Sequence, residues 1–166
     1  CPSCGYDNAE VKAALPGKVE AVDLPGRLVT PGLVDGHCHF LSYVLSLRRV
    51  DLRDLPSLAA CRERIREAVR GRAPGEWVLG RGWNHHNWEE KREPLRGDLD
   101  DIAPDNPVMM VRACGHSQWV NSRALELARV DERTPDPHDG RIQRDDSGRP
   151  TGALHEGAMS LVERLV

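Results

Sequence analysis

The sequence predicts a fold of the α/β class, and three kinds of segment support this prediction. Apolar residues over positions 58–69 have the spacing of an amphipathic helix. A continuous apolar run over residues 108–113 is typical of a buried strand. Short segments with partial alternation of apolar and polar residues, at 18–24 and 28–34, indicate further strands. The length of 166 residues is that of one ordinary domain.

The N-terminal elements lead towards the predicted helix. The pair Pro25-Gly26 indicates a turn between the first two strands. Residues 40–50 are apolar at helical spacing, which predicts a helix or turn, and residues 50–52 predict a short strand.

The helix over residues 58–69 has the strongest pattern in the chain. Asp54 or Ser57 can cap its first turn, and Gly71 is a suitable stop. Its Arg and Glu residues form a solvated face without an assigned function. The apolar stripe that faces the core consists of Leu58, Cys61, Ile65, Ala68 and Val69.

The remaining predicted elements are shorter, and glycine, proline or asparagine marks most of their ends. They are a strand at 77–79 with a glycine-containing loop exit, a short helix at 98–103, an exit loop at 115–120 after the buried strand, a helix at 122–129 capped by Asn121, a hairpin of 141–144 with 151–154, and a helix from 156 onwards.

Composition and charge argue against several classes of protein. The net charge is −3 and basic residues are interleaved with acidic ones, so the concentrated basic surface of a nucleic-acid-binding protein is not expected. No apolar run approaches 18 residues and no signal peptide is visible, so we expect no membrane span and a cytoplasmic protein. The chain begins at Cys1 rather than Met, which suggests a truncated or processed start.

The five cysteines are odd in number and irregularly spaced, so a disulfide framework is not expected. Cys1 and Cys4 form one Cys-x-x-Cys pair, as in one knuckle of a zinc ribbon. A structural zinc site needs a second pair, which the chain does not have. A redox motif and two free thiols at the terminus are the other interpretations, and the free thiols are favoured.

Two histidines separated by one residue, His37 and His39, are the leading candidate site. In an extended chain, side chains i and i+2 point to the same face about 7 Å apart, so both imidazoles would point to one location. This is how a site for zinc or a similar divalent ion begins, although two strand histidines can also be surface or core residues. Asp35 could accept a hydrogen bond from a ligand imidazole or be a turn carboxylate.

The segment Pro31-Gly32-Leu33-Val34-Asp35-Gly36-His37-Cys38-His39 resembles the first-strand motif of the amidohydrolase superfamily, Pro-Gly-x-x-Asp-x-His-x-His. Motifs further along the chain resemble, in the same order, the third amidohydrolase family, a branch of metal-dependent hydrolases that includes formamide deformylase-like enzymes. They are Gly80-Arg81-Gly82-Trp83, Trp88, Leu99-Asp100, Ala103-Pro104, Gly115-His116, Trp119-Val120-Asn121-Ser122, Ala124-Leu125, Gly140-Arg141-Ile142, Thr151-Gly152-Ala153-Leu154 and Glu156.

This resemblance implies the N-terminal part of a TIM-like (β/α)₈ barrel that is incomplete in this chain, because such a barrel needs roughly 200–250 residues. The implied segments are an N-terminal β segment (1–30), the first barrel strand with the element after it (31–56), an inserted α/β segment (57–150) and the start of the next barrel unit (151–166).

The resemblance further implies hydrolysis of C–N bonds of the amide type in a small-molecule substrate. His37 and His39 would hold one or two divalent metals, with zinc as the expected ion. The other metal ligands and the catalytic groups are expected further along the complete enzyme, so the catalytic residues of this chain stay unknown and the fragment is expected to be inactive alone. Alternatives are a non-enzymatic fragment that forms homo-oligomers through exposed strand edges, or a small structural zinc-binding module that uses Cys1, Cys4 and the histidines.

Four other features of the sequence bear on the site. His116 is predicted to contact substrate or support the site, with a loop histidine bonded to backbone as the alternative. Trp83 and Trp88 could line a substrate pocket or be buried aromatic residues. Glu156 could approach the metal or be a carboxylate in the first turn of a helix. The adjacent pair His85-His86 is predicted to be a solvated part of a loop.

Overall fold

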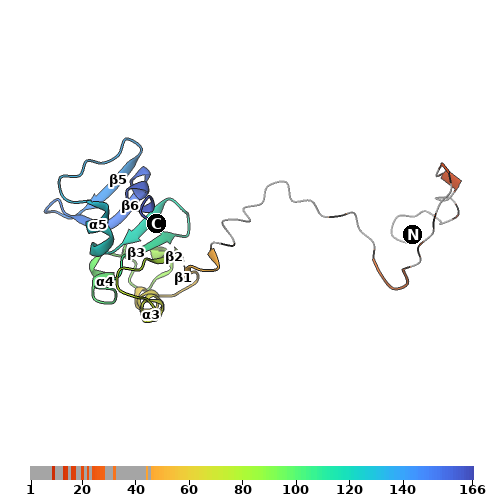
Figure 1. Ribbon diagram of the computed structural model, residues 1–166, viewed down its shortest axis with the longest axis horizontal. Coiled ribbons are helices and arrows are strands. Elements are labelled where there is room, and N and C mark those ends of the chain that lie inside the picture. The colour runs from red at the N-terminus through yellow and green to blue at the C-terminus, as the bar shows by residue number, and fades with distance from the viewer. Residues whose placement is uncertain are drawn as a thin grey trace. The chain divides into compact units, whose positions relative to one another are not determined.

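The computed structural model describes residues 46–166 together with scattered residues before position 46. The chain divides into two units, residues 1–38 and residues 39–166, and every element named below belongs to the second unit. This unit is built on one six-stranded sheet with helices packed against it (Figure 1). The predicted α/β class is confirmed.

The sheet is mixed, with the strands in the order β1-β2-β3-β4-β6-β5. β1, β2 and β3 are parallel neighbours, whereas β3 with β4, β4 with β6, and β6 with β5 are antiparallel pairs. β6 therefore runs parallel to β3, and both strands end at the same edge of the sheet. The strands are β1 (Val50–Asp51), β2 (Val78–Trp83), β3 (Val108–Arg112), β4 (Ser117–Val120), β5 (Gly140–Arg144) and β6 (Pro150–Glu156).

From Val50 onwards, the helices are short except for α3. They are α3 (Leu58–Val69), the 3₁₀ turn η1 (His85–Asn87), α4 (Gly97–Asp100), α5 (Ser122–Ala128), the 3₁₀ turn η2 (Gly157–Met159) and α6 (Ser160–Glu163). None of the helices in the described part of the chain has the length and apolar character that a membrane span requires.

Helix α3 has the predicted bounds, because its sequence supplies both a cap and an apolar stripe. The Oγ of Ser57 accepts a hydrogen bond from the backbone N–H of Ala60 at 3.1 Å, which satisfies one of the free donors of the first turn. Leu58, Cys61 and Ile65 are buried. Of the two cap candidates, Ser57 is therefore the cap.

In the N-terminal unit, the predicted turn is confirmed and the predicted strands are not. Arg27 N–H donates to the carbonyl of Leu24 at 3.2 Å across Pro25-Gly26. The described residues within the predicted strands 18–24 and 28–34 belong to no strand, because alternation alone supplies no partner for a strand's backbone. The rest of these segments lies outside the described residues, as do residues 40–43 and 45 of the predicted helix or turn at 40–50. Among the described residues of that segment, Val44 and Ser46 are helical, and Leu47 and Arg48 form a turn.

Two predictions for the middle of the chain were wrong in extent. The strand predicted at 77–79 continues as β2 to Trp83, because Gly80 is a position of close packing rather than a loop exit. A Cβ on Gly80 would collide with the Sδ of Met110 and lie 2.9 Å from the carbonyl oxygen of Val50. The predicted loop at 115–120 contains strand β4, which pairs with β3 from Met109 to Val111.

The hairpin of β5 and β6 is confirmed, but the helix predicted from residue 156 onwards is wrong in its start and length. Ile142 lies opposite Leu154 across the hairpin. Glu156 is the last residue of β6, and the helical residues after it end at Glu163.

Two apolar cores lie on opposite faces of the sheet. Met109 belongs to one core and its neighbour Met110 to the other, and Trp119 and Val120 divide in the same way, as expected when successive strand side chains alternate. One core contains buried residues of α3 and three tryptophans, and the other contains buried residues of α5 and α6. The parallel strands are thus covered on both faces, which leaves their ends as the accessible edges.

Candidate functional site

The predicted metal ligands His37 and His39, together with Asp35, lie outside the described residues, as do Cys1 and Cys4. Their geometry stays a prediction. A pair of imidazoles is a donor set that suits zinc and similar divalent cations. Within the described part of the chain, no group of three or more His, Cys, Asp and Glu side chains could hold a metal ion.

His116 lies in the turn between β3 and β4, at the edge where β3 and β6 end. Its Nδ1 is 3.1 Å from Oε2 of Glu156, and its carbonyl oxygen accepts a hydrogen bond from the Glu156 backbone N–H at 3.1 Å. The side chains are 68% and 59% exposed, respectively. Because the carboxylate can only accept, Nδ1 carries the proton that joins the two side chains. The Nε2 atom of a neutral His116 ring is then left as an acceptor.

Glu156 contacts His116 rather than beginning a helix, so the prediction of a first-turn carboxylate was wrong. It ends β6 with a φ of 50°. This conformation is uncommon for a residue with a side chain, and it turns the chain sharply from the strand into η2. His116 directly precedes β4, and Ser117 of β4 lies opposite His155 of β6, which explains why residues 40 positions apart meet.

A second polar chain lies beside this pair and was not found from the sequence. The Oγ of Ser117 is 2.9 Å from Nδ1 of His155, and Nε2 of His155 is 3.0 Å from Oε1 of Gln143. Because the Gln143 oxygen accepts, the ring donates from Nε2 and accepts from the Ser117 hydroxyl at Nδ1. Ser117 is buried, so this chain of contacts holds β4, β5 and β6 together. The predicted hairpin could have indicated that His155 lies near Gln143, because the two residues belong to its paired strands. No feature of the sequence indicates the contact with Ser117.

Trp83 and Trp88 are core residues in this structure. Both are buried with Trp119, with ring centroids 5.9 to 6.4 Å apart, and the indole N–H of Trp83 donates to the carbonyl of Met110 at 2.7 Å. This arrangement favours the alternative of buried aromatic residues. Contact of Trp83 with substrate stays a prediction.

His85 is buried, so its prediction as a solvated loop residue was wrong, whereas His86 is exposed as predicted. The two rings do not diverge, because the turn η1 places their centroids 4.1 Å apart. The pKa of His85 is lowered from 6.5, first by burial and then by the nearby His86 and Arg112, while Glu93 opposes the shift. His85 is therefore held in its neutral form.

We expect His85 to make the fold less stable in mild acid. The unfolded chain takes up the proton at the ordinary pKa near 6.5 and the folded chain only at lower pH, so the free energy of unfolding falls as the pH drops below about 6.5. Urea unfolding at several pH values should show a shallower pH dependence for His85→Gln than for the wild type. His138→Gln, at an exposed position, should keep the wild-type slope, and an equal slope for all three proteins would contradict the prediction.

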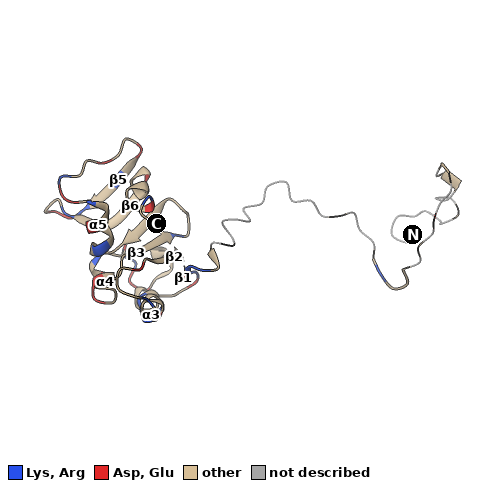
Figure 2. Cartoon of the chain, in the orientation of Figure 1, with Lys and Arg blue, Asp and Glu red and all other residues tan. Residues whose placement is uncertain are grey.

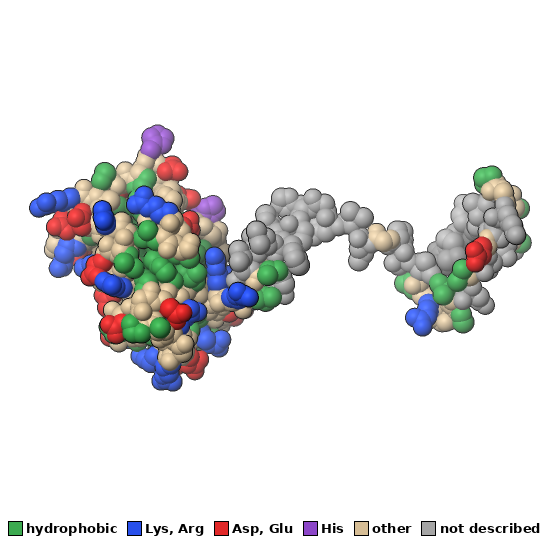
Figure 3. Space-filling view, viewed as in Figure 1, with side chains coloured by type: hydrophobic (Ala, Val, Ile, Leu, Met, Phe, Trp, Pro, Cys, Tyr) green, Lys and Arg blue, Asp and Glu red, His purple; other side chains and the backbone are tan. Residues whose placement is uncertain are grey.

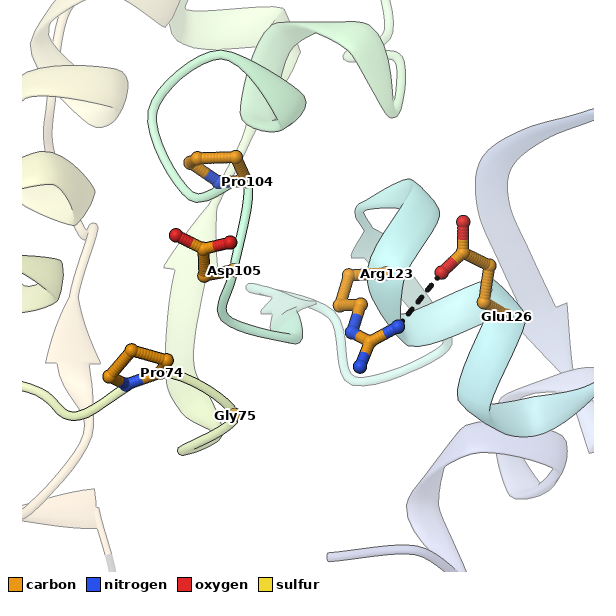
Figure 4. Close-up of a pocket in the computed structure, with 6 residues that line it drawn as sticks. All are labelled: Pro74, Gly75, Pro104, Asp105, Arg123 and Glu126. Atoms are coloured by element: carbon orange, nitrogen blue, oxygen red, sulfur yellow. Dashed lines mark hydrogen bonds and ion pairs between the residues drawn. The ribbon is translucent and has the colours of Figure 1, made fainter.

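One hollow lies at the opposite edge, where β2 and β3 begin (Figure 4). Its volume is about 490 Å³ and its lining consists of Pro74, Gly75, Pro104, Asp105, Arg123 and Glu126. Arg123 and Glu126 form an ion pair at 3.1 Å between two positions of α5. Ligands of parallel sheets bind outside the carboxyl ends of the strands, so the position of this hollow at the amino ends argues against a functional site.

Charges of both signs are interspersed along the described segments and over the face of the second unit that is shown (Figures 2 and 3). On that face no large area carries a single sign of charge. The formation of homo-oligomers through strand edges stays a prediction.

Comparison with known proteins places the chain in a family. The family model described as "Amidohydrolase family" matches residues 20–166. Two similar proteins are Protein LONG AFTER FAR-RED 3 of Arabidopsis thaliana, 40% identical over 141 residues, and the N-substituted formamide deformylase of Arthrobacter pascens, 37% identical over 155 residues. These alignments cover 85% and 92% of this chain, but only 24% and 29% of the two relatives.

A solved structure supports the same relationship. An uncharacterized metal-dependent hydrolase from Pyrococcus furiosus is 30% identical, with a TM-score of 0.56 over 81% of this chain and 25% of the other. The chain therefore spans less than a third of the length of each of these three proteins.

Proposed function

Because the chain belongs to the amidohydrolase family, we propose that it supplies the first part of a metal-dependent hydrolase that cleaves C–N bonds of the amide type in small molecules. The match of the family model to residues 20–166, a range that includes the His-x-His segment, carries this proposal. The similarity of the chain to a protein named as an N-substituted formamide deformylase and to a solved structure described as a metal-dependent hydrolase supports it. In this proposal, residues beyond the chain complete a TIM-like barrel.

His37 and His39 are the proposed ligands of the metal, with zinc as the expected ion, and Asp35 is proposed to orient one of their imidazoles through a hydrogen bond. When bound, such a cation lowers the pKa of water and polarises the substrate carbonyl. The group that accepts the proton from water is proposed to lie beyond this chain, since the chain covers less than a third of its relatives.

His116 is proposed to contact substrate at the edge where β3 and β6 end. The Glu156 carboxylate fixes the ring through Nδ1, which leaves Nε2 of the neutral ring to accept a hydrogen bond from an amide N–H. Because the side chain is 68% exposed, the contact requires no rearrangement of the core.

The proposal predicts that zinc binding depends on the two histidines. The purified chain is dialysed against a chelator, loaded with zinc and analysed for bound metal by mass spectrometry. Replacing both His37 and His39 with Ala should remove nearly all of the bound zinc, because each imidazole is a direct ligand. His86→Ala with His138→Ala removes two exposed histidines and should leave the zinc content unchanged.

Two outcomes would contradict the proposal. Loss of zinc in Cys1→Ser with Cys4→Ser, but not in the histidine variant, would favour a structural zinc-binding module instead. Equal zinc content in every variant would remove His37 and His39 from the metal centre.

A further inference from the structure

A basic cavity lies at the edge of the sheet opposite to the hollow of Figure 4. Its volume is about 450 Å³, within the range of small-molecule sites. Its lining comes from the segments at the ends of β1, β2 and β3, with Arg53, Arg81, Arg112 and Gly115 among its residues. The carboxyl ends of three parallel strands thus meet at one cavity, which is where open α/β sheets bind their ligands.

Four guanidinium groups line this cavity, and no acidic side chain is among its described lining residues. Arg53 is neutralised by Asp51, whose Oδ1 accepts from its Nε at 2.9 Å. Within the described part of the chain, Arg49, Arg81 and Arg112 form no ion pair with a carboxylate. Among the described residues, the cavity therefore has an excess of about three positive charges.

The guanidinium of Arg112 is held in place rather than free in solvent. It lies 5.7 Å from the centroid of the Trp83 ring, a contact that favours a cation over an aromatic face. The loop beside it is fixed to β2, because Ala113 N–H donates to the carbonyl of Trp83 at 3.0 Å. A guanidinium held in this way loses little freedom when it binds an anion.

We propose that this cavity binds a small organic anion through its carboxylate or phosphate group, with Arg81 and Arg112 as the main contacts and Arg49 adding charge. Guanidinium groups match both oxyanions because they can donate two parallel hydrogen bonds. The contacts proposed here use neither of the proposed metal ligands, so the anion site can be tested separately from the metal chemistry.

The test is calorimetric titration of the 166-residue chain with sodium phosphate and with sodium acetate, at an ionic strength held constant with sodium chloride. We expect saturable binding of at least one anion. Arg81→Gln should weaken it by about tenfold or more, as expected for loss of a hydrogen bond to a charged group. Arg133→Gln, at an exposed position away from the cavity, is the matched control and should leave the affinity unchanged.

The two titrations identify the chemistry of the ligand. Binding of phosphate alone indicates a phosphate ester, binding of acetate alone indicates a carboxylic acid, and both results support the site. Absence of binding above the chloride background, or an equal loss in Arg81→Gln and Arg133→Gln, would overturn it.

A second measurement keeps the proposal testable if a variant fails to fold. Cys114 is exposed and lines the cavity, whereas Cys61 is buried. The bound anion should slow alkylation of Cys114 by neutral iodoacetamide, as measured by mass spectrometry of the peptide that contains it. An unchanged rate at a saturating anion concentration would place the anion elsewhere. Binding that survives the replacement of both His37 and His39 with Ala would separate this site from the metal centre.

Discussion

Gly152→Ala is expected to cost about 3 kcal/mol or more of the free energy of unfolding, because two penalties coincide at this residue. Gly152 lies within β6 with a φ of 98°, a conformation that L side chains rarely adopt. A Cβ there would also lie 2.5 Å from the carbonyl oxygen of Val120 and 2.9 Å from the backbone nitrogen of Arg96. Neither atom can move without disturbing the sheet, since Arg96 N–H donates to the Thr151 carbonyl at 2.6 Å.

Gly148→Ala separates the two penalties. Gly148 has a φ of 80°, but an added Cβ would have nothing within 4 Å, so only the conformational cost of about 1–2 kcal/mol applies. Urea unfolding followed by circular dichroism gives both values on the same scale. If the two variants lose the same free energy, the close approach at Gly152 does not contribute and the argument from packing fails.

Much of the fold can be predicted from local sequence because its signals are local. Helix α3 has a serine cap and an apolar stripe, and the hairpin of β5 and β6 has turn residues between two short strands. The predictions failed where the deciding contact is between distant segments. From the sequence alone, Gly80 is predicted to be a loop residue, because the close packing of Met110 and Val50 against it involves distant segments. In the same way, residues 115–120 are predicted to be a loop, because the pairing of β4 with β3 and β6 is not visible in the local sequence.

The family could be predicted from motifs whose order along the chain is itself a signal, and the match over residues 20–166 confirms it. The local environment of single residues could not be predicted in this way. Trp83 and His85 lie in a polar and aromatic segment that could be at the surface. In the structure, Trp83 is buried in a core with two other tryptophans, and His85 is buried beside it. The basic cavity could not be predicted from the sequence either. Arg49, Arg81 and Arg112 are separated from one another by about 30 residues along the chain, and the parallel pairing of β1, β2 and β3 brings them to one cavity.

Asn121→Ala is expected to destabilise the fold by about 3 kcal/mol or more, since one buried side chain satisfies four backbone groups. Its Oδ1 accepts from the N–H of Ala124 at 3.0 Å, which caps α5, and from the N–H of Val108 at 2.9 Å, which begins β3. Its Nδ2 donates to the carbonyls of Ala103 and Asn106 at 3.1 and 2.9 Å. The side chain therefore joins α5, β3 and the loop before β3.

Asn87→Ala is the matched control, because Asn87 is exposed and its loss should change the free energy of unfolding by less than about 0.5 kcal/mol. A loss near 1 kcal/mol for Asn121→Ala in urea unfolding would mean that Asn121 acts only as a helix cap and that water replaces its other three bonds.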